Sequence, residues 1–227
     1  MTNIKHVFFD LDHTLWDFDR NSALTFERIF ELHQVNLKLS DFLKVYEPIN
    51  LAYWKLYREE QISKSDLRYR RLRDAFDGMH FYPEDDLIYK LSEAYIEHLT
   101  TINFLFEGTV EVLEYLNNSY ELHIITNGFE EAQNKKLQHS KIESFFKTVT
   151  NSEMVGVKKP NPKIFNFALA AANAKAADSV MIGDSLEADI QGAQGVGMHT
   201  IFFDSKDQVT NYSKLKINKL ELLKQLL

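Results

Sequence analysis

The chain has 227 residues, a length that fits one compact domain with a sizeable insertion better than two full domains. Apolar residues make up 44% and charged residues 26%, which excludes a mostly disordered chain. Cysteine is absent, which excludes a disulfide scaffold, a thiol nucleophile and a metal site with cysteine ligands. Because the net charge of -7 repels nucleic acid phosphates, we expect no DNA or RNA polymer as a partner.

Membrane insertion and export leave no signal in the sequence. No apolar run reaches the length needed to span a bilayer, and residues 1–12 lack the basic, apolar and small-residue order of a signal peptide. We therefore expect a cytoplasmic protein with no membrane partner, present as a monomer or a weak dimer.

The first third of the chain predicts one strand followed by helices. The apolar run at residues 4–9 predicts a buried strand that ends at Asp10. Four helical stretches follow: residues 21–34, residues 40–60, a helix between the capping-box residue Ser63 and Gly78, and a helix that starts at Pro83. Helices of this size predict a small bundle inserted after the first strand.

The rest of the chain alternates strands with helices. Apolar runs predict strands at residues 120–126, 148–150, 179–183 and 199–203. Helices are expected to begin at Gly108, with Val110, Leu113 and Leu116 on one face, and at Asn161. The leucine-rich residues 217–227 predict a final amphipathic helix.

This order predicts an α/β protein with a doubly wound, Rossmann-like parallel sheet. The expected domains are a core of residues 1–18 and 103–227 and a helical bundle of residues 19–102. In such sheets ligands bind at the carboxyl ends of the strands.

Two carboxylates follow the first predicted strand. Asp10 and Asp12 are separated by one residue, and Thr14 comes two residues later. Without a partner the two acids would repel each other, which raises the pKa of one of them. A divalent cation relieves this repulsion, and hard oxygen ligands suit Mg²⁺. Two surface acids in a loop would show the same pattern.

Further polar residues follow the other predicted strands. The hydroxyl and backbone amides of Thr126-Asn127-Gly128 could hold phosphate oxygens. Lys159, whose backbone is restricted by the following proline, could offset phosphoryl charge. Asp184 ends a strand, and Asp189 could hold the loop or a metal-bound water. Each motif alone also fits a plain turn, a solvated lysine or a helix cap.

In this order the motifs resemble those of the haloacid-dehalogenase-like hydrolase superfamily, and the resemblance spans essentially the whole chain. The matching segments are Asp10-Leu11-Asp12-His13-Thr14, Thr126-Asn127-Gly128, Lys159-Pro160, and Gly183-Asp184 with Asp189. The helical bundle between the first two motifs looks like the helical cap of that superfamily.

The resemblance implies phosphoryl transfer through an aspartyl-phosphate. Asp10 would be the nucleophile, and Asp12 would protonate the leaving oxygen and then deprotonate the attacking water. Mg²⁺ would be held by the Asp10 carboxylate, the Asp12 backbone carbonyl and Asp184, with Asp189 in support. The dehalogenases of the superfamily usually lack the second aspartate, so the presence of Asp12 favours phosphate chemistry over carbon–halogen cleavage.

The same resemblance implies which residues hold the substrate. Thr126 and Lys159, together with the motif residues Asn127 and Gly128, would hold the phosphate oxygens. The segment from Phe8 to Asp19 looks like the bacterial pyrimidine 5′-nucleotidase branch, known for acting on noncanonical nucleoside monophosphates. Trp16 and Phe18 in this segment could offer a flat surface to a nucleobase.

Two other functions remain open at this point. One is a phosphatase for small metabolites of the phosphoglycolate or phosphosugar type. The other is a phospho-aspartate signalling module, which also combines acids, a threonine and a lysine on a doubly wound sheet. The length of the chain and its helical insertion argue against the signalling module.

Overall fold

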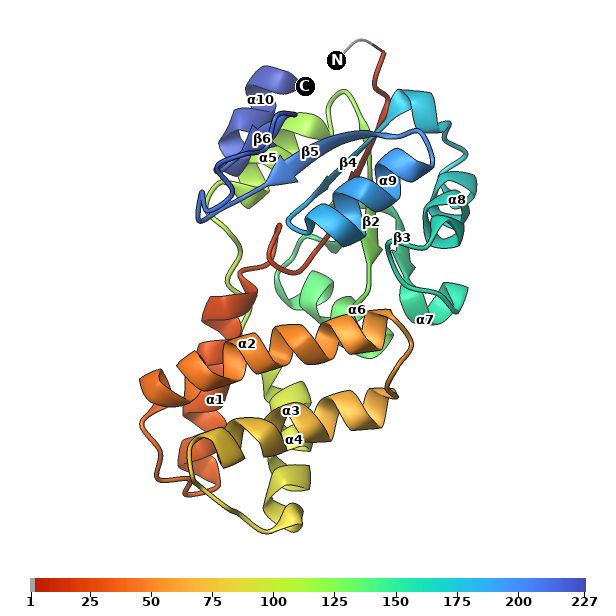
Figure 1. Cartoon of the computed structure of the whole chain (residues 1–227). Helices are drawn as coiled ribbons and strands as arrows, with labels where there is room; N and C mark the ends of the chain where they lie inside the picture. The colour runs from red at the N-terminus through yellow and green to blue at the C-terminus, as the bar shows by residue number, and fades with distance from the viewer. Residues whose placement is uncertain (1–2) are drawn as a thin grey trace. The chain divides into compact units, whose positions relative to one another are not determined.

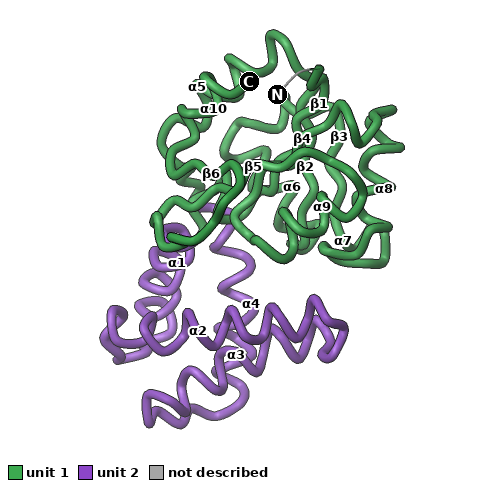
Figure 2. The backbone as a smooth tube through the Cα atoms, turned by 45° about the horizontal axis from the view of Figure 1, so that its top comes forward, with its two compact units in different colours: residues 1–18, 103–227 green, residues 19–102 purple. Residues whose placement is uncertain are grey.

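The computed structural model describes residues 3–227, which divide into two compact units (Figure 2). One unit combines the N-terminal segment up to Phe18 with Asn103–Leu227, and the other is Asp19–Ile102. The first is an α/β unit and the second is a helical unit. None of the helices in residues 3–227 is both long enough and apolar enough to cross a membrane.

The α/β unit is built on a six-stranded sheet in the order β3-β2-β1-β4-β5-β6. Every pairing between neighbouring strands is parallel, which confirms the predicted doubly wound fold. The strands are β1 (His6–Phe9), β2 (Glu121–Thr126), β3 (Phe146–Asn151), β4 (Ser179–Gly183), β5 (His199–Phe203) and β6 (Lys216–Ile217).

Strand β1 lies in the middle of the sheet and all four of its residues are buried. Phe9 is in register with Ile124 of β2 on one side and with Ile182 of β4 on the other. The residues that follow these positions therefore lie at one edge of the sheet, where Asp10 follows β1, Thr126 ends β2 and Asp184 follows β4.

Helices cover both faces of the sheet. Phe8 and Ile125 belong to an apolar cluster with Ile164 and Phe165 of α8 (Pro162–Ala171) and Ala193 of α9 (Gly192–Gly195). Figure 1 shows α9 in front of the strands and α5 (Thr109–Leu116) behind them. The other connecting helices of this unit are α6 (Glu130–His139), η1 (Glu143–Phe145), α7 (Ser152–Val155), η2 (Ala176–Asp178) and η3 (Leu186–Gln191).

Two local predictions for this unit need correction. Val110 is 42% exposed, and α5 instead buries Thr109 and Val112 beside the expected Leu113 and Leu116. The cause is the helical period of 3.6 residues: a spacing of three drifts by roughly 60° a step, so Val110 lies roughly 120° around the helix from Leu116. Residues 217–227 do not form one helix, because Ile217 pairs with Phe203 in the sheet. Only η4 (Leu220–Leu222) and α10 (Leu223–Leu226) are helical in that segment.

The helical unit contains the four predicted helices: α1 (Phe18–Leu32), α2 (Leu39–Arg58), α3 (Lys64–Gly78) and α4 (Asp85–Leu99). Helix α3 begins with the predicted capping box, in which Ser63 and Asp66 satisfy each other's backbone amides. The core of the unit is aromatic and centres on Phe26 of α1, whose ring packs against rings of α1, α2 and α4.

We expect Phe26→Ala to lower the free energy of unfolding of the helical unit by about 3–5 kcal/mol, because it leaves a cavity among four aromatic rings. Leu32→Ala on the same helix is the matched control, since Leu32 is 60% exposed and its loss should cost less than about 0.5 kcal/mol. Urea denaturation followed by circular dichroism measures both values. Equal losses in the two variants would contradict this description of the core.

Candidate active site

Three carboxylates meet at the carboxyl edge of the sheet. Asp10, Asp184 and Asp189 each offer an oxygen, and these oxygens lie within 4.8 Å of one another. The neighbouring strands β1 and β4 bring Asp10 beside Asp184, and the turn of η3 returns Asp189 to the same edge. Gly183 leaves room for this return, because a Cβ at that position would lie 2.3 Å from Asp189 Oδ2. The structure thus brings together three of the acids that the motifs single out.

The side chain of Lys159 reaches into this acidic cluster. Its Nζ donates to Asp10 Oδ1 at 2.6 Å and to the carbonyl oxygen of Ile125 at 2.6 Å. The same atom lies 2.6 Å from Asp189 Oδ1. Lys159 is 2% exposed, so these contacts take place away from water. Burial alone would lower the pKa of Lys159, but Asp10 and Asp189 raise it, so the ammonium stays charged.

The charges of the cluster do not balance. When all three carboxylates are ionised, they and the one ammonium leave an excess of two negative charges. Burial, followed in size by the Asp189 carboxylate, raises the pKa of Asp184 to about 8. Burial also raises the pKa of Asp10 well above its usual range, against the opposing effect of Lys159. A divalent cation among these oxygens would supply the missing charge, so the donor set fits a hard ion such as Mg²⁺.

Hydrogen bonds at the carboxyl edge of the sheet hold the motif Thr126-Asn127-Gly128 at the end of β2. The hydroxyl of Thr126 accepts from the backbone amide of Gly128 at 3.1 Å. Asn127 holds the lysine loop, because its Oδ1 accepts from Lys159 N at 2.7 Å and its Nδ2 donates to Lys159 O at 3.0 Å. The amide group of Asn127 therefore positions Lys159, and its contact with a substrate stays a prediction.

The carboxylate of Asp12 lies apart from the three clustered acids and is held from α6. Gln133 Nε2 donates to Asp12 Oδ2 at 2.9 Å and also to Thr126 Oγ1 at 2.6 Å. Lys136 Nζ donates to Asp12 Oδ1 at 2.5 Å. Gly128 is needed here, because a Cβ at that position would lie 2.3 Å from Gln133 Nε2. Sequence reasoning missed both Gln133 and Lys136. Their positions in the helix, next to the apolar residues Ala132 and Leu137, could have indicated that these two polar side chains are buried.

The aromatic residues after Asp12 need a correction. Trp16 has no exposed surface, its indole N–H donates to Asn103 Oδ1 at 3.2 Å, and Lys136 Nζ lies 4.2 Å from its ring centroid. Trp16 is thus a buried support for Lys136 and does not offer the expected open surface for a base. Phe18 is half-buried, and its ring centroid lies 4.8 Å from that of His13.

Comparisons with known proteins agree with this geometry. Residues 7–203 match the family model described as haloacid dehalogenase-like hydrolase. The chain is 32% identical to pyrimidine 5′-nucleotidase YjjG of Escherichia coli, over 88% of this chain and 85% of the relative. It is 34% identical to a glyceraldehyde 3-phosphate phosphatase of Pyrococcus abyssi, over 88% of this chain and 81% of the relative.

A solved structure has the same fold over nearly its whole length. The magnesium-bound HAD-hydrolase YfnB of Bacillus subtilis superimposes with a TM-score of 0.90 at 27% identity and covers 99% of both chains. The match of the family model, the order of the motifs and the parallel sheet lead to one conclusion. This chain belongs to the haloacid dehalogenase-like hydrolase family.

Proposed function

We propose that this chain is a magnesium-dependent phosphomonoester hydrolase in which Asp10 is the nucleophile. The observation that carries the proposal is the buried contact of Asp10 with Lys159. It lies at the edge of the sheet where β2 ends at Thr126 and Asp184 follows β4. An oxygen of Asp10 would attack phosphorus while the bond to the leaving oxygen breaks, which forms an aspartyl-phosphate. Lys159 and Thr126 would then hold equatorial oxygens of the phosphoryl group.

The residues that would hold Mg²⁺ are Asp10 and Asp184, with the backbone carbonyl of Asp12 and with Asp189 in support. When bound, the ion supplies positive charge that screens the nucleophile from the phosphate and lowers the raised pKa values of the two carboxylates. Asp189 also accepts from the backbone amide of Ser185 at 3.0 Å, which fixes the loop that carries Asp184.

Asp12 would transfer the protons in both halves of the reaction. In the first step its proton moves to the leaving oxygen, and in the second it takes a proton from the water that attacks the aspartyl-phosphate. Gln133 and Lys136 hold the Asp12 carboxylate in one orientation between these steps.

For the leaving group we propose a nucleoside, and a pyrimidine nucleoside 5′-monophosphate as the preferred substrate. The segment from Phe8 to Asp19 and the 32% identity to YjjG support this choice. The half-buried ring of His13 follows Asp12 directly in the chain, and the ring of Phe18 packs beside it; both would meet the leaving group. We assign the helical unit Asp19–Ile102 the part of the family's cap, which selects the leaving group.

A small phosphorylated metabolite is the second candidate. The 34% identity to a glyceraldehyde 3-phosphate phosphatase is as high as that to the nucleotidase. The burial of Trp16 also removes one of the two aromatic surfaces expected for a base. Both candidates use the same chemistry at Asp10 and differ only in the leaving group.

We expect phosphate release that needs Mg²⁺ and is fastest with pyrimidine 5′-monophosphates. The panel contains pyrimidine and purine monophosphates, their deoxy forms, glyceraldehyde 3-phosphate, phosphoglycolate and sugar phosphates. Asp10→Asn serves as the blank, because it should abolish turnover and keep the fold. A preference for glyceraldehyde 3-phosphate would replace the nucleotide assignment, and retained turnover in Asp10→Asn would contradict the nucleophile.

We expect Asp12→Asn to slow the release of nucleosides far more than the release of p-nitrophenol. A nucleoside alkoxide is a poor leaving group and needs a proton, whereas p-nitrophenolate leaves without one, and general acid catalysis contributes roughly 10²–10⁴-fold. The ratio of kcat/KM between variant and parent on the two substrates measures the difference. Equal kcat/KM ratios on the two substrates would contradict the role of Asp12 as the general acid.

We expect Lys159→Met, assayed in EDTA, to lower the free energy of unfolding by about 3–5 kcal/mol, because it leaves buried carboxylates without their cation. Added Mg²⁺ should restore part of that loss, since the ion compensates the same carboxylates. Lys163→Met is the matched control, because Lys163 is exposed at the start of α8. The assignment fails if both variants unfold at the same denaturant concentration.

A further inference from the structure

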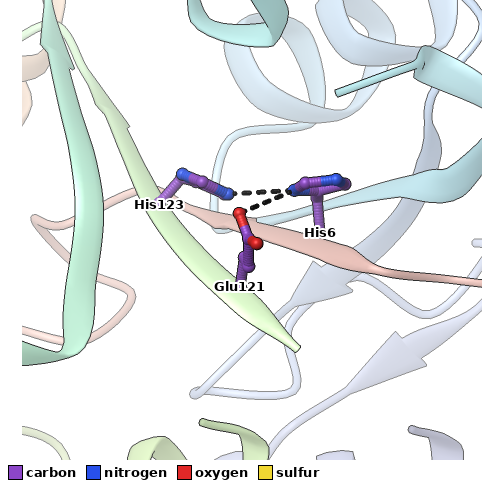
Figure 3. A group of neighbouring side chains, drawn as sticks. All are labelled: His6, Glu121 and His123. Atoms are coloured by element: carbon purple, nitrogen blue, oxygen red, sulfur yellow. Dashed lines mark hydrogen bonds and ion pairs between the residues drawn. The ribbon is translucent and has the colours of Figure 1, made fainter. Parts of the chain in front are cut away.

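A second group of metal-ligating side chains lies at the opposite end of the sheet from the candidate active site. His6 begins β1, and Glu121 and His123 come from β2. Figure 3 shows the two imidazole rings facing each other, with the Glu121 carboxylate beside the gap between them. One ligand atom from each residue lies within 4.8 Å of the other two. The mechanism proposed above uses none of the three.

The register of the sheet places these side chains on one face. His6 pairs with Glu121 across β1 and β2, and His123 follows Glu121 by two residues. Because side chains alternate along a strand, positions two apart point to the same side. Residue 148 of β3 pairs with His123, so the hydroxyl of Thr148 lies on that face as well. The side chains of His6, Glu121 and His123 therefore converge because their strands pair, and their positions do not depend on a flexible loop.

The distances match those of a tetrahedral transition-metal site. His6 Nδ1 and His123 Nε2 are 3.2 Å apart. Two nitrogen ligands, each roughly 2.0–2.1 Å from a tetrahedral zinc ion, are roughly 3.3 Å apart. Glu121 Oε2 lies 3.7 Å from His6 Nδ1, and its side chain is 57% exposed, so a small rotation brings the carboxylate closer.

The contacts of His123 orient one of its ring nitrogens toward the candidate metal position. Thr148 Oγ1 lies 2.9 Å from His123 Nδ1 and satisfies that nitrogen, which leaves Nε2 facing His6. A hydrogen bond to the second ring nitrogen is the usual outer contact of a metal-bound histidine.

We propose that His6, His123 and Glu121 form a binding site for a divalent transition metal ion of the zinc class. Two imidazole nitrogens and one carboxylate oxygen are ligands that suit zinc and do not suit Mg²⁺. The site is thus chemically distinct from the cluster of carboxylates at the other edge. Three protein ligands leave a fourth position for water.

Metal binding at this site ties β1 to β2 at their amino ends. Without metal, a hydrogen bond that contains one proton joins the facing nitrogens of His6 and His123. The metal takes the place of that proton, which moves to the other nitrogen of His6. Asp10 is four residues away along an extended strand, a distance of about 13 Å. The ion therefore stabilises the α/β unit and takes no part in hydrolysis.

The test titrates Zn²⁺ into the full-length protein, without a polyhistidine tag, by calorimetry and by thermal unfolding. Millimolar Mg²⁺ is present throughout, so that the carboxylate cluster is already occupied. We expect one zinc ion per chain and a rise in Tm, because a ligand of the folded state stabilises it. His6→Asn and His123→Asn should each weaken zinc binding by more than the roughly 10- to 100-fold that loss of an outer contact costs. His199→Asn is the matched control, since His199 is exposed at the amino end of β5.

Two further variants keep the test decisive if a histidine variant fails to fold. Glu121→Gln changes an exposed ligand, and Thr148→Val removes only the outer hydroxyl and should weaken zinc binding roughly 10- to 100-fold. Addition of Co²⁺ should give the visible absorption of a tetrahedral site, which Glu121→Gln should change. The proposal is overturned if stoichiometric zinc leaves the Tm unchanged, or if zinc binds Glu121→Gln and Thr148→Val as tightly as the parent.

Discussion

The contact of the Lys159 ammonium with Asp10 and Asp189 is the interaction on which the candidate active site depends. Three carboxylates cannot share one buried strand edge without a cation, because each raises the free energy of ionising the others. Lys159 supplies one positive charge, and Asn127 holds its backbone in place through two hydrogen bonds. The loop that carries the lysine, the end of β2 and the end of β1 are thus joined by charge and by hydrogen bonds.

The remaining negative charge explains how a metal ion and a phosphate could both be attracted to the same edge. Two charges are left uncompensated around Asp10 and Asp184, and this excess suits a divalent cation. Around Asp12, hydrogen-bond donors dominate, because Lys136 and Gln133 reach this residue from α6. The ring face of Trp16 contacts the ammonium group of Lys136. This contact gives a role to a tryptophan that is buried where we expected an exposed ring.

The two ends of the sheet carry different chemistry. Hard carboxylate oxygens gather at the carboxyl edge, where Asp10 and Asp184 follow β1 and β4. Imidazole nitrogens gather at the amino edge, where His6 and His123 share one face of neighbouring strands. The separation follows from strand direction, since residues at the start and the end of one short strand cannot meet. The two proposed metal sites therefore lie at opposite ends of one sheet and use different kinds of ligand atom.

The sequence alone determined strands β1 to β5, the family and the acids at the strand ends, because apolar runs that stop at a polar residue are local signals. It missed β6, which is defined by its pairing with β5. It did not reveal Gln133 and Lys136, whose roles arise only when α6 packs beside Asp12. It could not show that Trp16 is buried, since its partner Asn103 follows the helical insertion in the chain. The meeting of His6 with His123 likewise required the register between β1 and β2. Tertiary structure decided these points, because each is a contact between residues that local pattern does not connect.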